Sequence, residues 1–454
     1  MNNIVGRVND SVTRQEAGGI TSVLWQPCLL PEWPATQAKH VFDISLGKML
    51  QPSPNNPDDV ETPYIKAINV QWSGINTEDL PTMWASSSEI KALNLKIDDL
   101  LVCEGGEVGR ASILSNTTPD NCIYQNALHR VRSETNDVRY LKYCLKQASE
   151  SGWFDVLCNR ATIAHFTVEK FRELRIHIPP PKTQRLIADY LDRETARIDA
   201  LVTEKEKMLA LLEEKRAALI SRAVTRGLNP DAPLKPSGLD WLGDIPTHWD
   251  VWKLKYVVSK IGSGVTPRGG AESYQSEGVP LFRSQNIHFD GLRMDDIVFI
   301  DSDTHDSMSN SKVLAGDVLI NITGASIGRC FYIEEMQGEA NVNQHVCIVR
   351  PSSQIETKFL YFTLRSDLGQ HQIDLSQSGS GREGLNFESL GNFSVVIPPV
   401  SEQRAIIEHL ETIGQKSAVL LTEIRNSISR LLERRAALIT AAVSGQIPLE
   451  EMTE

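Results

Sequence analysis

The stretch IPPPKTQR, from Ile178 to Arg185, has a near copy in IPPVSEQR, from Ile397 to Arg404, which starts 219 residues later (178 to 397). Each stretch leads without a gap into a helical pattern. Both patterns close on a basic, alanine-rich segment, KRAALI ending at Ile220 and RRAALI ending at Ile439. A repeat this long indicates a duplicated domain, because solenoid repeats run to about 20 to 50 residues.

The same interval relates earlier positions in the chain. Arg110 matches Arg329 and Gln125 matches Gln344, while PYIKAIN and PLFRSQN match two residues out of step. Short strand-like runs such as LLVCEG and DVLINITG alternate with Gly and Pro and with helical runs such as RYLKYCLK and KFLYFTLR. This mixture is typical of α+β domains. We predict an α+β fold: two similar globular domains separated by two long helices that form an antiparallel coiled coil, with a pseudo-twofold relation.

The composition fits a globular protein. The 454 residues favour about three domains, and 41% hydrophobic with 23% charged residues is an ordinary balance. No apolar run approaches the roughly 18 residues of a membrane helix, and the N-terminus has no apolar signal core. We therefore expect a cytoplasmic protein. Seven cysteines without a CxxC pair indicate buried free thiols, with neither a disulfide framework nor a metal site.

Both helical patterns carry large apolar residues at intervals of three, four and seven, the a/d spacing of a coiled coil. Polar residues such as Lys205 and Ser417 interrupt this seam, which specifies its register. The predicted seam residues are Ile187, Leu191, Ile198, Leu201, Met208, Leu212 and Leu219 in the first helix and Ile406, Leu410, Ile413, Leu420, Ile424, Leu431 and Leu438 in the second.

The segment between the two repeats, rich in Pro and Gly, predicts a linker. A helix of about 42 residues spans about 63 Å, and a parallel pair would force the chain to return that distance. An antiparallel pair needs no return. The predicted organisation is residues 1–20 an N-terminal arm or a disordered segment, 21–180 the first domain, 181–226 a helical spacer, 227–245 the linker, 246–399 the second domain, 400–446 the second helical spacer and 447–454 a tail.

Two similar but non-identical domains held at a fixed separation fit a ligand that is itself linear and approximately twofold. Duplex DNA is such a ligand, because two readers must face the same side of the double helix, roughly 34 Å apart for half-sites one turn apart. A bipartite, asymmetric DNA target follows as a hypothesis. The net charge of −12 argues against strong DNA binding by the chain alone.

Along nearly its full length the chain resembles the specificity subunit of type I restriction-modification systems. The resemblance rests on the two IPPxxxQR stretches, the basic-alanine helix ends, GDIPTHWDVWKL from Gly243, GSGVTP from Gly262, RSQNI from Arg283 and the GxxxGR elements at Gly105 and Gly324. The first domain departs from the pattern, with LLPEWP in place of a GxIPxxW opening and no obvious GSGxTP copy near Gly47.

The resemblance implies a non-catalytic subunit with two target-recognition domains. It also implies three partners: double-stranded DNA, two modification subunits that use S-adenosylmethionine, and ATP-driven restriction subunits. S-adenosylmethionine, ATP and Mg would then be bound by those partner subunits, with no cofactor, metal or catalytic residue in this chain and no membrane contact.

Phosphate contacts need Lys and Arg, and base readout needs forked or amide side chains. The candidates for DNA binding are Lys66, Arg110, Gln125, Arg130 and Arg160 in the first domain and Arg268, Arg283, Arg329, Gln344 and Arg382 in the second. For each one, a solvated charge or a structural hydrogen bond is the competing explanation, and a Gly-Arg step after a strand equally suits a turn.

Two other classes of function compete with DNA recognition. An enzyme would need a nucleotide loop, an (N/D)PP(F/Y) cluster or clustered carboxylates with a lysine; IPPP and IPPV lack the Asn or Asp, and the Gly-rich loops do not match phosphate-binding motifs. A purely structural coiled coil would explain the helices. It would not explain two domains that differ at Gly-rich, Arg-bearing loops.

Overall fold

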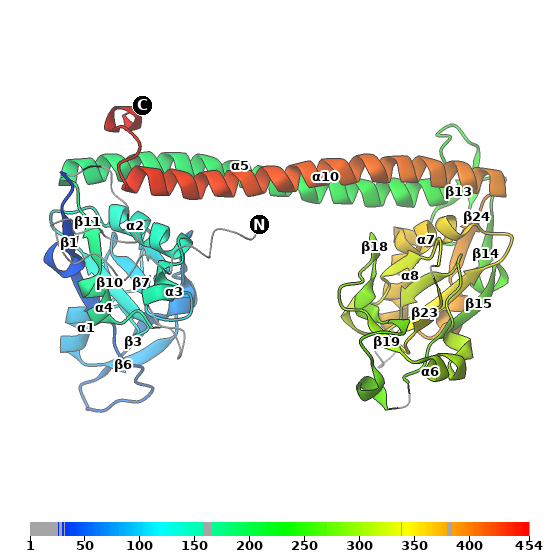
Figure 1. Cartoon of the computed structure of the whole chain (residues 1–454), viewed down its shortest axis with the longest axis horizontal. Coiled ribbons are helices and arrows are strands. Elements are labelled where there is room, and N and C mark those ends of the chain that lie inside the picture. The colour runs from blue at the N-terminus through cyan, green and yellow to red at the C-terminus, as the bar shows by residue number, and fades with distance from the viewer. Residues whose placement is uncertain are drawn as a thin grey trace. The chain divides into compact units, whose positions relative to one another are not determined.

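The computed structural model describes Gln26, Leu30 and residues 32–157, 165–267, 269–336, 338–378 and 384–453 (Figure 1). The chain divides into two compact units. Unit 1 consists of Met1–Glu204 together with Ser427–Glu454, and unit 2 consists of Lys205–Asn426. Arg160, Arg268 and Arg382, three of the candidate DNA-binding residues, lie outside the described residues.

Unit 1 is built on a four-stranded antiparallel sheet in the order β2-β10-β7-β8, beside a three-stranded sheet in the order β6-β3-β9. Strand pairs β1-β11 and β4-β5 complete it. The strands are β1 (Ala35–Gln37), β2 (Asp43–Leu46), β3 (Val60–Ile65), β4 (Val70–Gln71), β5 (Gly74–Ile75), β6 (Thr82–Ala85), β7 (Leu100–Cys103), β8 (Ala111–Ile113), β9 (Ile123–Tyr124), β10 (Leu128–Arg132) and β11 (Arg175–His177). The short helices are α1 (Ser87–Leu93), α2 (Val138–Glu150), α3 (Trp153–Leu157) and α4 (Val168–Glu173).

Unit 2 repeats this order element by element. Its four-stranded sheet is β15-β23-β20-β21 and its three-stranded sheet is β19-β16-β22, with pairs β14-β24 and β17-β18. The strands are β14 (Asp250–Lys253), β15 (Val258–Ser263), β16 (Val279–Phe282), β17 (Ile287–His288), β18 (Gly291–Leu292), β19 (Val298–Ile300), β20 (Val318–Asn321), β21 (Cys330–Tyr332), β22 (Asn341–Val342), β23 (Val346–Pro351) and β24 (Ser394–Ile397). The short helices are α6 (Ser302–Ser307), α7 (Thr357–Arg365), α8 (Asp367–Ser378) and α9 (Phe387–Gly391).

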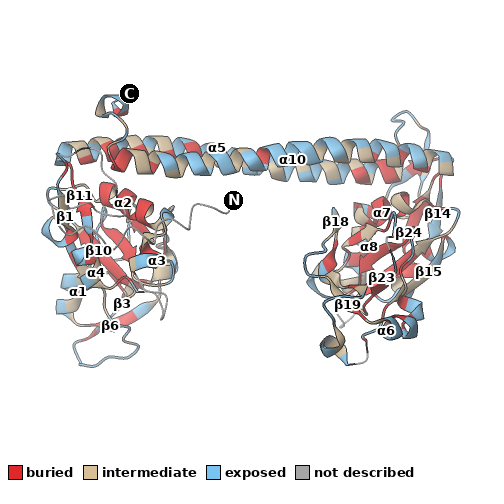
Figure 2. Cartoon of the chain, viewed as in Figure 1, coloured by how far each residue is buried: buried red, intermediate tan, exposed pale blue. Residues whose placement is uncertain are grey.

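The predicted α+β class is confirmed, and the short runs named from the sequence form the expected elements. LLVCEG contains β7 and DVLINITG contains β20, both entirely buried. RYLKYCLK and KFLYFTLR lie in α2 and α7, whose apolar faces pack against the sheets. Figure 2 shows the buried residues gathered on the sheets and on α2 and α7. The core of each unit is therefore sheet against helix.

The long helices are α5 (Pro181–Arg226) and α10 (Val400–Val443). Within unit 2, Arg425 pairs with Glu213, and the side chain of Arg216 lies against Gly414. Higher numbers on α5 thus meet lower numbers on α10, so the two helices run antiparallel in this unit. In unit 1, Arg435 bonds to Asp199. The pseudo-twofold relation between the domains stays a prediction.

The seam is partly where the sequence predicts it. Ile187, Leu191, Ile198, Ile406, Leu410 and Ile424 are buried, and Leu212, Leu219, Ile413, Leu431 and Leu438 are half-buried. Leu201 (45% exposed), Met208 (48%) and Leu420 (40%) are not on it; Val202, Leu209 and Leu421 point inward instead.

The reason for this correction is the strict heptad alternation of four and three residues. It passes through a polar position, Thr195, that a search for large apolar residues omits. Counting seven residues from Leu191 to Ile198 and then three to Leu201 shifts the prediction by one residue. The true step from Ile198 is four, to Val202.

The linker and the tail are both structured. Residues 227–245 include β12 (Leu234–Pro236), which pairs with β13 (Asp244–Pro246) as a hairpin. The tail forms a 3-10 turn, Leu449–Met452, and buries Met452 in the core of unit 1. Cys103, Cys122, Cys144, Cys330 and Cys347 are buried free thiols. No helix in the described ranges is long and apolar enough to cross a membrane.

Candidate nucleic-acid interface

Three turns meet at one end of the unit 1 sheets. The amide of Gln125 donates to the carbonyl of Ile65 (3.0 Å), and the guanidinium of Arg110 donates to the carbonyl of Ala67 (3.0 Å). The turns are those that follow β3, β7 and β9. We call Lys66–Ala67, Glu104–Arg110 and Gln125–Asn126 the first turn cluster. It collects residues that lie far apart in sequence on one polar surface.

Unit 2 brings together the equivalent turns. The amide of Asn343 donates to the carbonyl of Phe282 (3.0 Å), and the side chain of Asn321 donates to the carbonyl of Ser284 (2.8 Å). We call Arg283–Gln285, Ile322–Arg329 and Asn343–His345 the second turn cluster. The two clusters occupy the same place in two copies of one fold.

In each unit, a glycine directly after the first strand of the four-stranded sheet lies against the turn cluster. It is Gly47 after β2 in unit 1 and Gly264 after β15 in unit 2. A β-carbon on Gly47 would lie 2.3 Å from the carbonyl oxygen of Gln125, and one on Gly264 would lie 1.6 Å from that of Val342. Neither position can hold a larger residue without moving backbone. Gly47 is therefore the counterpart of Gly264 in GSGVTP, although the sequence around it offers no obvious copy of that motif.

Four of the candidate residues of unit 1 are described, and the structure separates them. Lys66, Arg110 and Gln125 all lie in the first turn cluster. Arg130 does not: only 6% exposed, it donates from its guanidinium to the carbonyls of Ala92 (3.0 Å) and Asn94 (3.4 Å). These bonds close the end of α1 onto β10, so Arg130 has a structural role here.

Three candidates of unit 2 are described, and all lie in the second turn cluster. Arg283 donates to the carbonyl of Asp296 (2.6 Å) and lies over the ring of Tyr274. Gln344 bonds to His345, with 3.0 Å between Nε2 of each. Arg329 is half-buried, and its guanidinium has no hydrogen bond or ion pair in the ranges that the structure describes.

Several polar residues of the clusters are absent from the sequence-based candidates. In the second cluster, the imidazole Nδ1 of His345 lies 2.6 Å from the hydroxyl of Thr323. In the first, the imidazole of exposed His165 lies 3.9 Å from Glu104, and burial raises the pKa of that carboxyl. A position within two residues of the end of a buried strand is the signal that could have identified Glu104 and Thr323.

The repeated glutamines of the IPPxxxQR stretches hold each domain to its own long helix. The carbonyl oxygen of the Gln184 side chain accepts from the amide of Asp137 (3.0 Å), and its nitrogen donates to the carbonyl of Pro179 (2.8 Å). Gln403 makes the equivalent bonds, to Glu356 (2.8 Å) and Pro398 (2.9 Å). Each glutamine is fully buried. The motif thus fastens the start of each long helix to its domain by buried hydrogen bonds.

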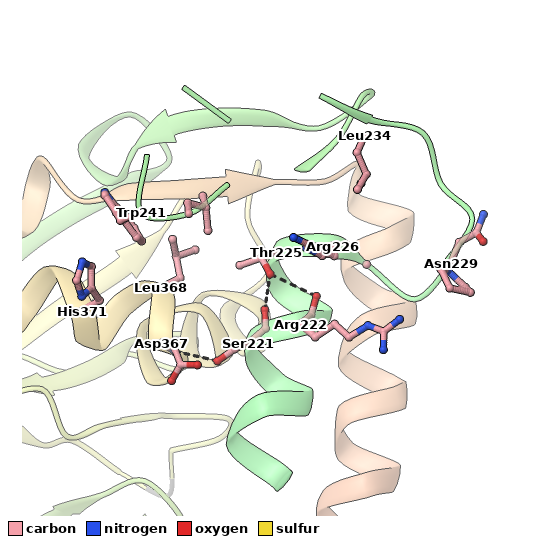
Figure 3. A pocket seen from close by; sticks show the side chains of 13 residues that line it. Ser221, Arg222, Thr225, Arg226, Asn229, Leu234, Trp241, Asp367, Leu368 and His371 are labelled. Atoms are coloured by element: carbon pink, nitrogen blue, oxygen red, sulfur yellow. Dashed lines mark hydrogen bonds between the residues drawn. The ribbon is translucent and has the colours of Figure 1, made fainter. Parts of the chain in front are cut away.

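A pocket of about 660 Å³ lies within unit 2, at the end of α5 (Figure 3). Its wall includes the partly exposed Trp241, whose ring lies 5.0 Å from that of His371. The helix end contributes Ser221, Arg222, Thr225 and Arg226. Figure 3 shows the bond between Ser221 and the amide of Asp367 (2.9 Å). In the described ranges, no group of three His, Cys, Asp or Glu side chains is placed to hold a metal ion.

Comparison with known proteins places these features in a family. The family described as "Type I restriction modification DNA specificity domain" matches residues 32–210 and 246–430. The chain is 25% identical over 303 residues to the type I restriction enzyme EcoBI specificity subunit of Escherichia coli, covering 64% of this chain and 62% of that protein.

It is also 23% identical over 382 residues to the MjaVIII specificity subunit of Methanocaldococcus jannaschii, covering 81% of this chain and 84% of that protein. A solved chain from a study of complex assembly and conformational transition of the type I R-M system has the same fold. Its TM-score is 0.69 at 17% identity, over 92% of this chain and 99% of that one.

Proposed function

Because the chain belongs to the type I restriction-modification DNA specificity family, we propose that it reads a bipartite, asymmetric DNA target, one half-site with each domain. Residues 21–180 form one recognition domain and 246–399 the other. The chain itself is non-catalytic, and it binds no cofactor. Adenine N6-methylation and ATP-dependent cleavage belong to partner subunits, which hold S-adenosylmethionine, ATP and Mg.

The observation that carries this proposal is the pair of turn clusters. Both sit at equivalent places on the same scaffold, yet their side chains differ. At equivalent positions unit 1 has Glu104, Glu107 and Ala127, whereas unit 2 has Ile322, Ser326 and His345. Scaffolds that match and polar surfaces that differ suit two readers of two different half-sites. The target is therefore asymmetric, and these clusters contain the residues that meet base edges.

The helical segments 181–226 and 400–446 act as the spacer between the half-sites, joined by the linker 227–245. The antiparallel packing of α5 against α10 supports this role, since it gives each domain one end of one helix and the start of the other. A paired helix is stiff over many turns. The number of unread base pairs between the half-sites then follows from the helix length.

The modification subunits dock on the long helices. Leu201 in unit 1 and Leu420 in unit 2 are equivalent positions of the repeat, and both are exposed large apolar residues. Two equivalent apolar positions support two copies of one partner. Leu201→Glu combined with Leu420→Glu should abolish copurification of the modification subunit, whereas Lys207→Glu with Lys416→Glu, both at polar exposed positions, should retain it.

DNA binding by the isolated chain tests whether tight binding requires the modification subunits. The net charge of −12 predicts weak binding by the chain alone, because phosphate contacts dominate affinity. Affinity should rise by at least tenfold when the modification subunits are added, measured by fluorescence anisotropy on a duplex that contains the target. Tight, sequence-specific binding by the chain alone would contradict this part of the proposal.

A further inference from the structure

Arg110 and Arg329 begin from the same backbone geometry in the two turn clusters. The amide of Arg110 donates to the carbonyl of Glu107 (3.1 Å), and the amide of Arg329 donates to that of Ser326 (3.1 Å). Their carbonyls accept from Cys103 and Asn321 respectively, each at 2.8 Å. Any difference between the two guanidinium groups must come from their side-chain surroundings.

The guanidinium of Arg110 already has hydrogen-bond partners within unit 1. It donates to the carbonyl of Ala67 (3.0 Å) and to the carboxylate of Glu107 (3.2 Å), and the side chain is 15% exposed. These bonds fasten the turn after β3 to the turn after β7. Arg110 is therefore a structural tie within the first turn cluster.

In unit 2 the equivalent turn is held by hydrogen bonds that do not involve the arginine. Asn321, the counterpart of Cys103, donates to the carbonyl of Ser284 (2.8 Å), which is the counterpart of the Ala67 carbonyl. Ser326 stands where unit 1 has Glu107, and its hydroxyl accepts a second bond from Asn321 (3.1 Å). Both partners that hold Arg110 are thus replaced, and the guanidinium of Arg329 has no hydrogen bond or ion pair to any residue in the described ranges.

Other side chains of the second turn cluster have the chemistry of base readout. Gln344 bonds to His345 through one amide atom (3.0 Å), and its Oε1 is buried with no partner in the described part of the chain. His345 is held in turn by Thr323 (2.6 Å). Amide, imidazole and hydroxyl groups read base edges, and an arginine among them most often takes guanine O6 and N7 through two parallel bonds.

We propose that Arg329 is a specificity-determining residue of the second domain, which donates two hydrogen bonds to O6 and N7 of one guanine in that domain's half-site. This inference rests on the proposed function, and it adds a base identity and a residue to it. It also assigns different roles to two arginines at the same position of the repeat.

The test uses the complete restriction-modification complex in its host, with the native gene replaced by each variant and N6-methyladenine mapped across the genome. Arg329→Ala and Arg329→Lys should both relax one G·C position in one half-site, with discrimination there falling about tenfold to a hundredfold. The other half-site should stay unchanged. The purified complexes, checked for a wild-type melting temperature, are also titrated with duplexes that carry every single base change, so that a loss of methylation still yields base preferences.

A graft between the units provides the matched test. Asn321→Cys with Ser326→Glu gives Arg329 the two partners that hold Arg110, so the same position should relax although the arginine is still present. Arg110→Ala removes a contact within unit 1, so it should lower the melting temperature and leave the half-site of the second domain unchanged. An unchanged motif with Arg329→Ala, or a uniform fall across all base changes, would overturn the proposal in favour of no DNA contact or a phosphate contact. Failure of the wild-type gene to restore any split motif would instead refute the proposed function.

Discussion

Trp249 lies directly over Gly227, the residue that follows α5. A β-carbon on Gly227 would come within 3.0 Å of the indole, and Gly227 has a positive φ of 73°. The indole nitrogen also donates to Glu402 in the first turn of α10 (2.9 Å). One fully buried tryptophan thus contacts the end of one long helix and the start of the other within unit 2.

Gly227→Ala should destabilise unit 2 by about 2 to 3 kcal/mol, because it adds a steric contact with Trp249 to the roughly 1 kcal/mol cost of a left-handed conformation. Gly238 has a similar φ of 80° and no atom near its missing β-carbon. Gly238→Ala is therefore the control that carries the conformational cost alone. Urea unfolding curves give both values; equal destabilisation would mean that the tryptophan contact contributes nothing.

Asp317 and Arg350 join the start of β20 to the end of β23, with 2.6 Å between Asp317 Oδ1 and the guanidinium. Asp317 is fully buried, and its other oxygen accepts from the amide of Leu314 (2.7 Å). Asp317→Ala should cost about 3 to 5 kcal/mol, since it leaves a partly buried charge without its partner. Asp306→Ala, which removes an exposed pair with Lys312, should cost less than about 1 kcal/mol. Similar losses for the two variants in thermal unfolding would contradict this ranking.

His129 makes the stability of unit 1 depend on pH. It is fully buried in β10, where Nε2 lies 2.7 Å from the carbonyl of Phe166, and burial lowers its pKa. The unfolded chain then binds a proton that the folded chain does not, so stability should fall as pH drops below about 6.5. His129→Gln keeps a polar group but cannot titrate. The unfolding free energy of this variant should change less than that of the wild type between pH 7.5 and pH 5.5; equal changes would assign the pH dependence to other groups.

The spacer proposal predicts a change in the target when the helices are shortened. Deleting residues 202–208 from α5 and 425–431 from α10 removes one heptad from each and preserves the seam. Seven residues correspond to about 10 Å, or roughly three base pairs at 3.4 Å each. Mapped methylation sites should keep both half-sites while the unread spacer shortens. A folded variant with an unchanged spacer would exclude the helices as the determinant of spacing.

The sequence predicts the duplicated α+β architecture and the long helices because repeats and apolar periodicity are local signals. It does not predict whether the guanidinium of Arg110 or that of Arg329 lacks a hydrogen-bond partner in the described part of the chain. That depends on Asn321 and Cys103, whose side chains contact a turn more than 30 residues away in sequence. The sequence does not reveal the structural bonds of Arg130 for the same reason, since its partners Ala92 and Asn94 lie on another element. The prediction that Leu201 lies on the seam is wrong because Thr195, a polar seam residue, gives no hydrophobic signal.

The measurement that tests the central claim most directly is a genome-wide map of N6-methyladenine in the host with and without this gene. The proposed function predicts that deletion removes methylation from one split, asymmetric motif, and that the intact gene restores it. Methylation that is unchanged by deletion, in a host from which the modification subunits copurify with this chain, would contradict the claim that its two domains select the target.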